Sequence, residues 1–358
     1  MTERSGNLWR ALLNAGCERM YCLAGKKTKP MKNLVRGITC FGLLSVWALT
    51  AFATERVTAA YTSIAAAYAP FWVAKDKGIF DKYNFDTRLI YMRGTIPTLA
   101  ALANSELDFV QSGASPFIPY AAKGGDVVLL GCLANKVIDY VVVAHPSITK
   151  IEQLRGKPIG ISRVGDQTHH YVREILKRYG ISLKEVRLVQ TGLQPERVAA
   201  LRQGLTMASI LNRPNNLPLE KEGYKRLLDI EDLKLPAGVR CLITTKKIMK
   251  AKPAMVDNFV MAWLESVRFI LTQKRETKQV IAKYTRNTDD VDLEEAWNTL
   301  ATQTEIPPYA SVSQIQGQAN MMAEDQPDLA RFDAKVMVDN SVIKKLEDSG
   351  WTKKLFGK

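Results

Sequence analysis

The feature that most constrains the fold of this chain is an alternation of short apolar strands with amphipathic helices, which occurs twice. The first series starts with a strand at 56–61 and ends with two nearly continuous apolar runs at 127–133 and 140–144. The second series extends from a strand at 158–162 to a strand at 225–228. Such alternation is typical of a mostly parallel sheet with helices on its faces, and continuous apolar runs are typical of strands buried on both faces. The sequence therefore predicts an α/β fold with two similar lobes.

The pattern changes after a strand predicted at 239–244. From there the chain is mainly helical, and residues 253–272 make up one long predicted helix. Apolar side chains recur along it at the helical spacing, at Val256, Phe259, Val260, Trp263, Val267 and Ile270. This spacing places them on one face, which is typical of an amphipathic helix that packs on a core.

The N-terminus has the organisation of a secretory signal. A basic start at 31–36 precedes an apolar run at 38–49 that is shorter than a spanning helix, and Ala51 and Ala53 stand where a signal peptidase recognises small residues. We predict that residues 1–53 are a signal peptide cleaved after Ala53, with Met31 favoured over Met1 as the start. A long basic leader from Met1 and an N-terminal membrane anchor remain the alternatives. No cysteine follows the apolar run at a lipid-attachment position, which favours a soluble periplasmic protein over a lipoprotein.

The net charge limits the classes of partner. Residues 1–53 hold eight Lys/Arg and two Asp/Glu, so their removal lowers the net charge from +14 to about +8. No basic tract and no stripe of interleaved aromatic residues is present, so nucleic-acid binding is not expected. The remaining positive balance either attracts anionic ligands or belongs to an ordinary solvated surface, and the second interpretation is the simpler one.

Two cysteines, Cys132 and Cys241, remain after the predicted cleavage. An oxidising compartment would allow them to pair. Each lies within an apolar run that resembles a buried strand, and this context favours two separate buried thiols. The sequence leaves the choice open, with free thiols as the expectation.

Catalytic and metal-binding motifs are absent from the sequence. It contains no G-x-S-x-G, Walker A, H-E-x-x-H or C-x-x-C pattern, so we predict that the chain is not an enzyme. The adjacent His169 and His170 could suggest a metal site, but neighbouring positions of a helix point about 100° apart. We therefore expect neither a metal site nor a cofactor.

Five segments in order resemble the nitrate/sulfonate/taurine-type, NMT1/THI5-like (SsuA/THI5-like) solute-binding proteins of ABC transporters. They are APFWVAKDKGIF at 69–80, LAALANSELDFVQ at 99–111, IEQLRGKPIGI at 151–161, PERVAALRQG at 195–204 and VDNSVIKKLEDSGW at 338–351. Together these segments extend over nearly the whole chain after residue 53. The segment 204–211 lacks an aspartate that the family often carries, and the tandem histidines are unusual for it, which points to a different ligand.

The resemblance implies a periplasmic binding protein-like fold of type II, with two α/β lobes, a hinge and a ligand cleft between them. On this basis we expect lobe 1 at 54–144 and 239–358, and lobe 2 at 145–238. The hinge is expected where the chain crosses between them, near 144–145 and 237–238. The expected protein is a monomer that binds its ligand between the lobes and delivers it to an ABC permease in the inner membrane.

Ligands of open α/β sheets collect beyond the carboxyl ends of the strands, where loops lead into helix N-termini that favour anions. The loops at these ends predict the ligand site. Arg163 and Arg213 are the expected partners of a carboxylate or sulfonate, because a guanidinium can bind such a group through two hydrogen bonds. Tyr140 is included, with core packing as its alternative. The predicted ligand-binding residues are Thr62, Ser63, Gly94, Thr95, Ser112, Gly113, Ser115, Tyr140, Ser162, Arg163, Gly165, Thr168, Thr191, Asn212 and Arg213.

The identity of the ligand is left open between a small anionic and a heterocyclic molecule. Two other functions are compatible with parts of the pattern. A sensory module that presents its ligand to a membrane receptor would use the same cleft. A THI5-like pyrimidine-precursor synthase is less compatible, because the cysteine-rich motif of that enzyme has no counterpart here.

Overall fold

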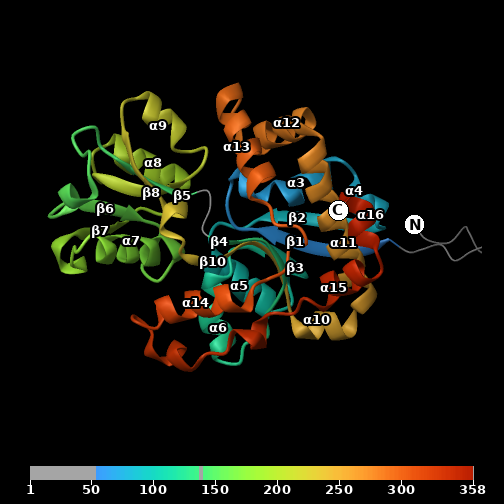
Figure 1. Ribbon diagram of the computed structural model, residues 1–358. Coiled ribbons are helices and arrows are strands. Elements are labelled where there is room, and N and C mark those ends of the chain that lie inside the picture. Colours follow the sequence, from blue (N-terminus) through green and yellow to red (C-terminus); the bar gives the residue numbers. More distant parts are fainter. Residues whose placement is uncertain (1–53, 137–139, 358) are drawn as a thin grey trace, which may run out of the picture. The chain divides into compact units, whose positions relative to one another are not determined.

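The computed structural model describes residues 54–136 and 140–357 (Figure 1). The predicted signal peptide, its cleavage site after Ala53 and the choice between Met1 and Met31 lie outside the described residues. Within the described part of the chain, no helix is both long enough and apolar enough to cross a membrane.

The first lobe is built on a five-stranded sheet with the order β2-β1-β3-β10-β4. Its strands are β1 (Glu55–Tyr61), β2 (Phe85–Tyr91), β3 (Phe109–Ser112), β4 (Val128–Lys136) and β10 (Pro236–Thr244). β1 is parallel to β2 and β3, whereas β10 is antiparallel to β3 and β4. β10 therefore returns from the second lobe and enters the sheet between two strands of the first series (Figure 1).

The second lobe is built on another five-stranded sheet, with the order β7-β6-β8-β5-β9. Its strands are β5 (Tyr140–Ala144), β6 (Pro158–Ile161), β7 (Arg187–Gln190), β8 (Ala208–Asn212) and β9 (Lys225–Asp229). β6 is parallel to β7 and β8, and β5 is antiparallel to β8 and β9. Both sheets thus have the same order, with one antiparallel strand inserted next to an edge, and the prediction of two similar, mostly parallel α/β lobes is confirmed.

Sheet pairing corrects the expected lobe membership of two segments. β5 was expected at the end of lobe 1, but it is hydrogen-bonded within the second sheet. Residues 236–238, expected in lobe 2, begin β10 of the first sheet. The apolar sequence of a buried strand does not indicate which sheet the strand joins. The sequence pattern alone therefore could not assign either segment to a lobe.

Helices cover both sheets. Those of the first lobe are α3 (Ala69–Asp76), α4 (Ile79–Lys82), α5 (Thr95–Ala103), α6 (Ile118–Ala122), α10 (Lys246–Ala251), α11 (Pro253–Thr272), α12 (Lys274–Thr285), α13 (Asp290–Gln303), α14 (Val312–Met322), α15 (Ser341–Asp348) and α16 (Trp351–Phe356). Those of the second lobe are α7 (Gln167–Arg178), α8 (Gln194–Arg202) and α9 (Leu217–Lys221). The long helix predicted at 253–272 has the bounds of α11, and its six predicted apolar residues are all buried.

Apolar side chains pack on both faces of the first sheet. Phe109 and Leu242 belong to one buried cluster, whereas their chain neighbours Val110 and Ile243 belong to the other, as the alternation of a strand requires. Phe259 of α11 stacks on Phe109 with ring centroids 3.8 Å apart. The return of the chain from the second lobe therefore closes the core of the first lobe.

Cys132 of β4 and Cys241 of β10 form a disulfide, so the expectation of two free thiols is wrong. The two residues are paired opposite each other in adjacent antiparallel strands. This pairing joins residues 109 positions apart, and the sequence context of each cysteine could not reveal it. The disulfide links the strand that leaves the first lobe to the strand that returns to it.

Candidate functional site

A cavity of about 110 Å³ lies between the two lobes, where loops from both sheets meet. An engineered cavity of about 150 Å³ is known to hold one benzene molecule, so this space suits a ligand of few heavy atoms. The two walls approach closely, because a Cβ added at Gly113 of the first lobe would lie 3.5 Å from Gln167 Oε1 of the second. Ten of the fifteen predicted residues line the cavity: Thr62, Ser63, Gly94, Thr95, Ser112, Gly113, Tyr140, Ser162, Thr168 and Asn212.

The first-lobe wall is formed by the loops that follow β1, β2 and β3. Thr62 Oγ1 lies 2.8 Å from the hydroxyl of Tyr68 and 3.2 Å from Ser112 Oγ, so the three hydroxyls form one network. Burial raises the pKa of Tyr68 far above its ordinary value, and the phenol therefore stays protonated. This wall offers neutral hydroxyl groups that can donate hydrogen bonds to a ligand.

The second-lobe wall follows β6 and β8 and includes the first turns of two helices. Thr168 Oγ1 accepts from Ser162 N at 2.9 Å and lies 2.8 Å from Ser162 Oγ, which fixes the loop before α7. Tyr140 donates its hydroxyl to Gln167 Oε1 at 3.2 Å. The wall is therefore held by its own hydrogen bonds.

Three helix N-termini face the cavity. Gly94 and Thr95 begin α5, Gln167 and Thr168 begin α7, and Leu193 and Gln194 begin α8, and all six residues line the cavity. The first N–H groups of a helix have no partner within it, and the helix dipole adds positive potential there. The arrangement favours an anion in the cavity.

Arg197 of α8 is the strongest electrostatic feature of the cavity. Its side chain is buried, with 4% exposed, and Nη1 donates to Gly192 O at 2.8 Å. Gln194, with its amide oxygen turned toward the arginine, accepts from Nη2 at 2.9 Å. Burial lowers the pKa of Arg197 to about 10, so the guanidinium is still charged at neutral pH. Within residues 54–136 and 140–357, no Asp or Glu forms an ion pair with it.

A second buried guanidinium, that of Arg240, reaches the cavity from β10 of the first lobe. It donates to Gln303 O at 3.0 Å and to Thr304 Oγ1 at 3.3 Å. Its backbone has φ 55°, a left-handed conformation that is uncommon for residues with a side chain. The strand is irregular on both sides, with register shifts at 236–239 and 242–243. The cavity thus has one buried arginine from each lobe.

Asp166, the residue before α7, brings a carboxyl group to the same cavity. Burial raises its pKa, and the hydroxyl of Ser162 and the guanidinium groups of Arg163 and Arg197 act in the opposite direction. An acid with a raised pKa is protonated more readily, and in that form it can donate a hydrogen bond to an anion.

Five predicted residues do not line the cavity. Ser115 is buried beside a separate small void, and Thr191 Oγ1 donates to Ile161 O. Gly165 contacts the two histidines of α7 through its backbone. Arg163 is exposed in an adjoining hollow of about 310 Å³. Arg213 is held between Asp229 and Glu295, so it is already neutralised and does not face the cavity.

Arg197 and Arg240 line the cavity but were not among the residues predicted from the sequence. Signals for both were present, since Arg197 lies in the familial segment PERVAALRQG, close to the predicted loop at Thr191. Arg240 is a charged residue inside an otherwise apolar strand, and charged residues are rarely fully buried unless they are paired. Tyr68, Gln167 and Gln194 were missed as well, and they lie on the helices beside the loops that were predicted.

Comparison with known families decides the classification. The model of the family described as "NMT1/THI5 like" matches residues 65–277, which is more than half of the chain. The chain belongs to the NMT1/THI5-like family. The resemblance noted in the five sequence segments is thereby confirmed.

Relatives and solved structures of this kind support the fold of the NMT1/THI5-like chain. A protein of Bacillus subtilis (strain 168), provisionally named an aliphatic sulfonates-binding protein, is 26% identical over 288 residues, which are 77% of this chain and 84% of that protein. The periplasmic aliphatic sulphonate binding protein SsuA of Escherichia coli superposes with a TM-score of 0.66 at 17% identity, covering 80% of this chain and 92% of that one. The periplasmic nitrate-binding protein NrtA of Synechocystis PCC 6803 gives a TM-score of 0.66 at 12% identity, with coverages of 83% and 89%. The two-lobed fold of periplasmic binding proteins is therefore confirmed.

Proposed function

We propose that this chain is an extracytoplasmic solute-binding protein that captures a small anionic organic molecule and delivers it to an ABC importer. The observation that carries the proposal is Arg197, a buried and charged guanidinium at the wall of a cavity between two lobes. It forms no ion pair in the described residues, and the carboxyl of Asp166, which lines the same cavity and interacts with it electrostatically, has a pKa raised by burial. A buried charge without an opposite charge is costly, and an anionic ligand would remove that cost.

The remaining cavity wall supports the same ligand class. Three helix N-termini, the hydroxyls of Thr62, Ser112 and Ser162, and Arg240 all offer donors or positive potential. The volume of about 110 Å³ restricts the enclosed part of the ligand to a small group. The names of the B. subtilis and E. coli relatives refer to sulfonates and that of NrtA to nitrate, which are both anions with several acceptor oxygens. A carboxylate or sulfonate head group on a short organic body fits this description.

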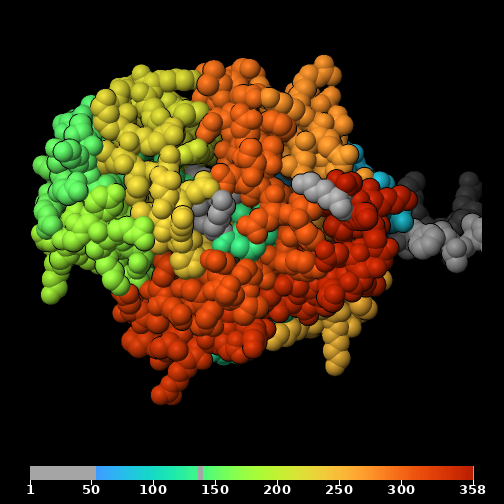
Figure 2. All heavy atoms as spheres, in the orientation of Figure 1, coloured from blue at the N-terminus to red at the C-terminus, as the bar shows by residue number. Residues whose placement is uncertain are grey.

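Closure of the lobes around the ligand is the proposed mechanism. Ion pairs between the lobes lie outside the cavity and join Arg93 to Glu196, Arg213 to Glu295 and Lys221 to Asp289. In Figure 2 the yellow surface of the second lobe meets the orange surface of the first. A ligand that contacts both walls favours the closed state only by its additional affinity for that state.

The proposal includes the setting in which such a protein works. The predicted signal peptide would direct the chain to the periplasm, where it would act as a monomer and dock on a permease in the inner membrane. The crossing of the chain from β9 to β10 would serve as part of the hinge between lobe 1 and lobe 2.

A thermal-shift screen tests the proposal. The panel contains alkanesulfonates, short carboxylates, nitrate and heterocyclic vitamin precursors, because a ligand that binds the native state raises its melting temperature. We expect at least one anion to raise the melting temperature of the wild type but not that of Arg197→Ala. Arg163→Ala is the matched control, since Arg163 is exposed outside the cavity. Stabilisation of the wild type by neutral compounds alone would contradict the proposal. Equal stabilisation of Arg197→Ala and Arg163→Ala by the anion would contradict it as well.

A further inference from the structure

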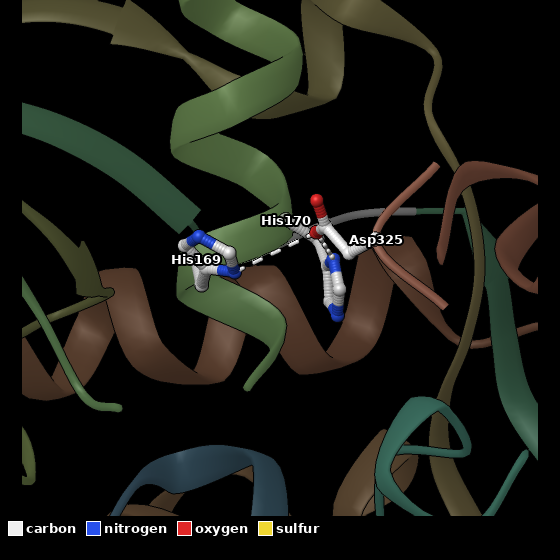
Figure 3. Close-up of side chains that lie close together, drawn as sticks. All are labelled: His169, His170 and Asp325. Carbon is white, nitrogen blue, oxygen red and sulfur yellow. Dashed lines mark ion pairs between the residues drawn. The ribbon is translucent and has the colours of Figure 1, made fainter. Parts of the chain in front are cut away.

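A second cluster of chemically active side chains lies at the contact between the lobes, outside the ligand cavity. His169 and His170 are in the first turn of α7, and Asp325 follows α14 (Figure 3). Asp325 Oδ2 lies 3.9 Å from Nδ1 of His169 and 3.8 Å from Nδ1 of His170. One ligand atom from each residue lies within 4.8 Å of the other two. Both imidazole rings thus approach the same carboxylate oxygen.

The arrangement of the three side chains allows a shared ion, although the divergence of neighbouring helix positions led us to expect none. Neighbouring helix positions do diverge by about 100°. Figure 3 shows, however, that Asp325 lies between the two rings and that the nitrogen on the near side of each ring points toward it. The third residue comes from a segment far away in the sequence, so the helix alone could not indicate it.

His170 has the environment of a prepared ligand. Its side chain is buried, with 3% exposed, and its Nε2 lies 3.0 Å from Gly165 O. That contact requires the proton on Nε2, because a carbonyl oxygen only accepts, and it leaves a lone pair on Nδ1. Nδ1 has no hydrogen-bond partner within the described structure. A ligating histidine usually donates its other N–H to a carbonyl or carboxylate, which is the arrangement seen here.

Nδ1 of His169 is also a hydrogen-bond acceptor, because it accepts from Gly165 N at 3.2 Å. Nδ1 of His170 therefore faces an oxygen of the Asp325 carboxylate with its lone pair unused, whereas Nδ1 of His169 would have to exchange its contact with Gly165 N for the ion. Lone pairs that converge in this way are stabilised by a cation between them.

Arg173 competes for the same carboxylate. Its Nη1 forms an ion pair with Asp325 Oδ2, and its Nη2 donates to Met321 O. The guanidinium forms an ion pair with the oxygen of Asp325 but leaves Nδ1 of His170 without a hydrogen-bond partner in the described structure. A cation at the histidines would have to share Asp325 with Arg173, so removal of Arg173 should strengthen its binding.

We propose that His169, His170 and Asp325 form a binding site for a divalent transition-metal ion such as zinc. Two imidazoles and one carboxylate are a ligand set that suits zinc, and solvent can supply a fourth ligand because the Asp325 side chain is 35% exposed. Tetrahedral coordination at about 2.1 Å would bring the ligand atoms to about 3.4 Å from each other. The three atoms lie within 4.8 Å of one another, so they would have to approach by up to about 1.4 Å.

The site would join the two lobes. His169 and His170 belong to α7 of the second lobe, and Asp325 follows α14, which packs in a core cluster of the first lobe. A bound ion would favour the closed arrangement and so strengthen ligand binding by linkage. Binding of the ion itself does not depend on the proposed transport function.

Calorimetric titration of zinc into the chelator-stripped protein, purified without a polyhistidine tag, tests the proposal. The chain has three histidines, and His145 is the matched control because its Nδ1 contacts Ser147 away from the cluster. We expect one zinc per chain in the wild type and in His145→Ala. We expect a loss of affinity of at least about tenfold in His170→Gln, which keeps a donor near Gly165, and in Asp325→Asn.

Arg173→Gln sharpens the test in the opposite direction. Removal of the competing guanidinium should raise zinc affinity several-fold. Circular dichroism of each variant establishes that it is folded. Absence of stoichiometric zinc binding in the wild type, equal affinity of His170→Gln and wild type, or loss of binding in His145→Ala would each overturn the proposal, as would weaker binding in a folded Arg173→Gln.

Discussion

Two regions where the lobes meet carry arginines in opposite electrostatic situations. One region is the contact between the lobes outside the cavity, called the rim below. There, Arg213 of the second lobe is neutralised by Asp229 of its own lobe and Glu295 of the other. At the cavity, Arg197 is more deeply buried. Arg213 is therefore neutralised by ion pairs without a ligand, whereas Arg197 forms no ion pair in the described part of the chain and interacts with the Asp166 carboxyl, whose pKa burial raises. From this difference we infer that Arg197, and not Arg213, binds the anionic ligand.

The energies of the two regions should differ accordingly. Partly exposed ion pairs contribute about 0–1 kcal/mol each, because both charges keep much of their hydration. A charge that is buried in a binding site and loses its partner costs about 2–5 kcal/mol. Substitutions in the cavity should therefore act mainly on ligand affinity, and those at the rim should act weakly on lobe closure.

The largest effect is expected for Arg197→Ala. Loss of the guanidinium should weaken binding of the anionic ligand by about thirtyfold or more, which corresponds to about 2 kcal/mol or more. Arg197→Lys should recover only part of the loss, since an ammonium cannot bind an oxyanion through two parallel hydrogen bonds. Calorimetry with the best ligand from the thermal-shift panel measures both. An affinity of Arg197→Ala within twofold of the wild type would remove Arg197 from the site.

The disulfide between Cys132 and Cys241 comes next, because it fastens the strand that carries Arg240 into the cavity wall. Cys132→Ala with Cys241→Ala should lower the free energy of unfolding by about 2–4 kcal/mol. Denaturant titration measures the change. Treatment of the wild type with a reductant is the control and should give a similar loss. Equal stability of the oxidised and reduced protein would show that this link does not support the fold.

A smaller effect is expected at the rim. Arg213→Ala should change ligand affinity by no more than about fivefold, because only its ion pair with Glu295 joins the two lobes, and a partly exposed pair contributes at most about 1 kcal/mol. The remaining effect should weaken at high salt, since screening reduces such interactions. Calorimetry at low and high salt measures it. A loss as large as that of Arg197→Ala would erase the distinction between rim and cavity.

The smallest effect concerns Asp166. Burial raises the pKa of its carboxyl in the folded protein, so ionisation disfavours folding above the ordinary pKa of 3.8, and this penalty disappears when the pH falls below that value. Asp166→Asn should therefore raise the melting temperature slightly at pH 7 and leave it unchanged at strongly acidic pH. Thermal melts across this pH range measure the difference. A lower melting temperature of the variant at neutral pH would contradict the assigned direction.

The sequence predicted the loops of the cavity better than its charges. Thr62, Ser112 and Ser162 follow strands, and the carboxyl ends of strands are where such loops gather, so strand order along the chain was sufficient to find them. The choice of arginine depended on tertiary partners. Arg213 was favoured from its loop position, but Asp229 and Glu295 come from other elements and neutralise it.

Long-range pairing accounts for the other differences. β5 could be assigned to a sheet only from its hydrogen-bond partners, and Cys132 and Cys241 meet only because β10 returns beside β4. Asp325 approaches His169 and His170 in the same way, from a segment about 150 residues farther along the chain. Local patterns predicted the elements, whereas contacts between distant segments depend on how the lobes are assembled.

A comparison of one anion with its neutral isostere measures whether the cavity selects its ligand by negative charge. The ligand that binds best in the thermal-shift panel is titrated by calorimetry beside the compound in which its sulfonate or carboxylate is replaced by a sulfonamide or amide of the same shape. We expect the wild type to prefer the anion by at least about thirtyfold and Arg197→Ala to lose most of this preference. Equal affinity of the wild type for the charged and neutral compounds would contradict selection by negative charge.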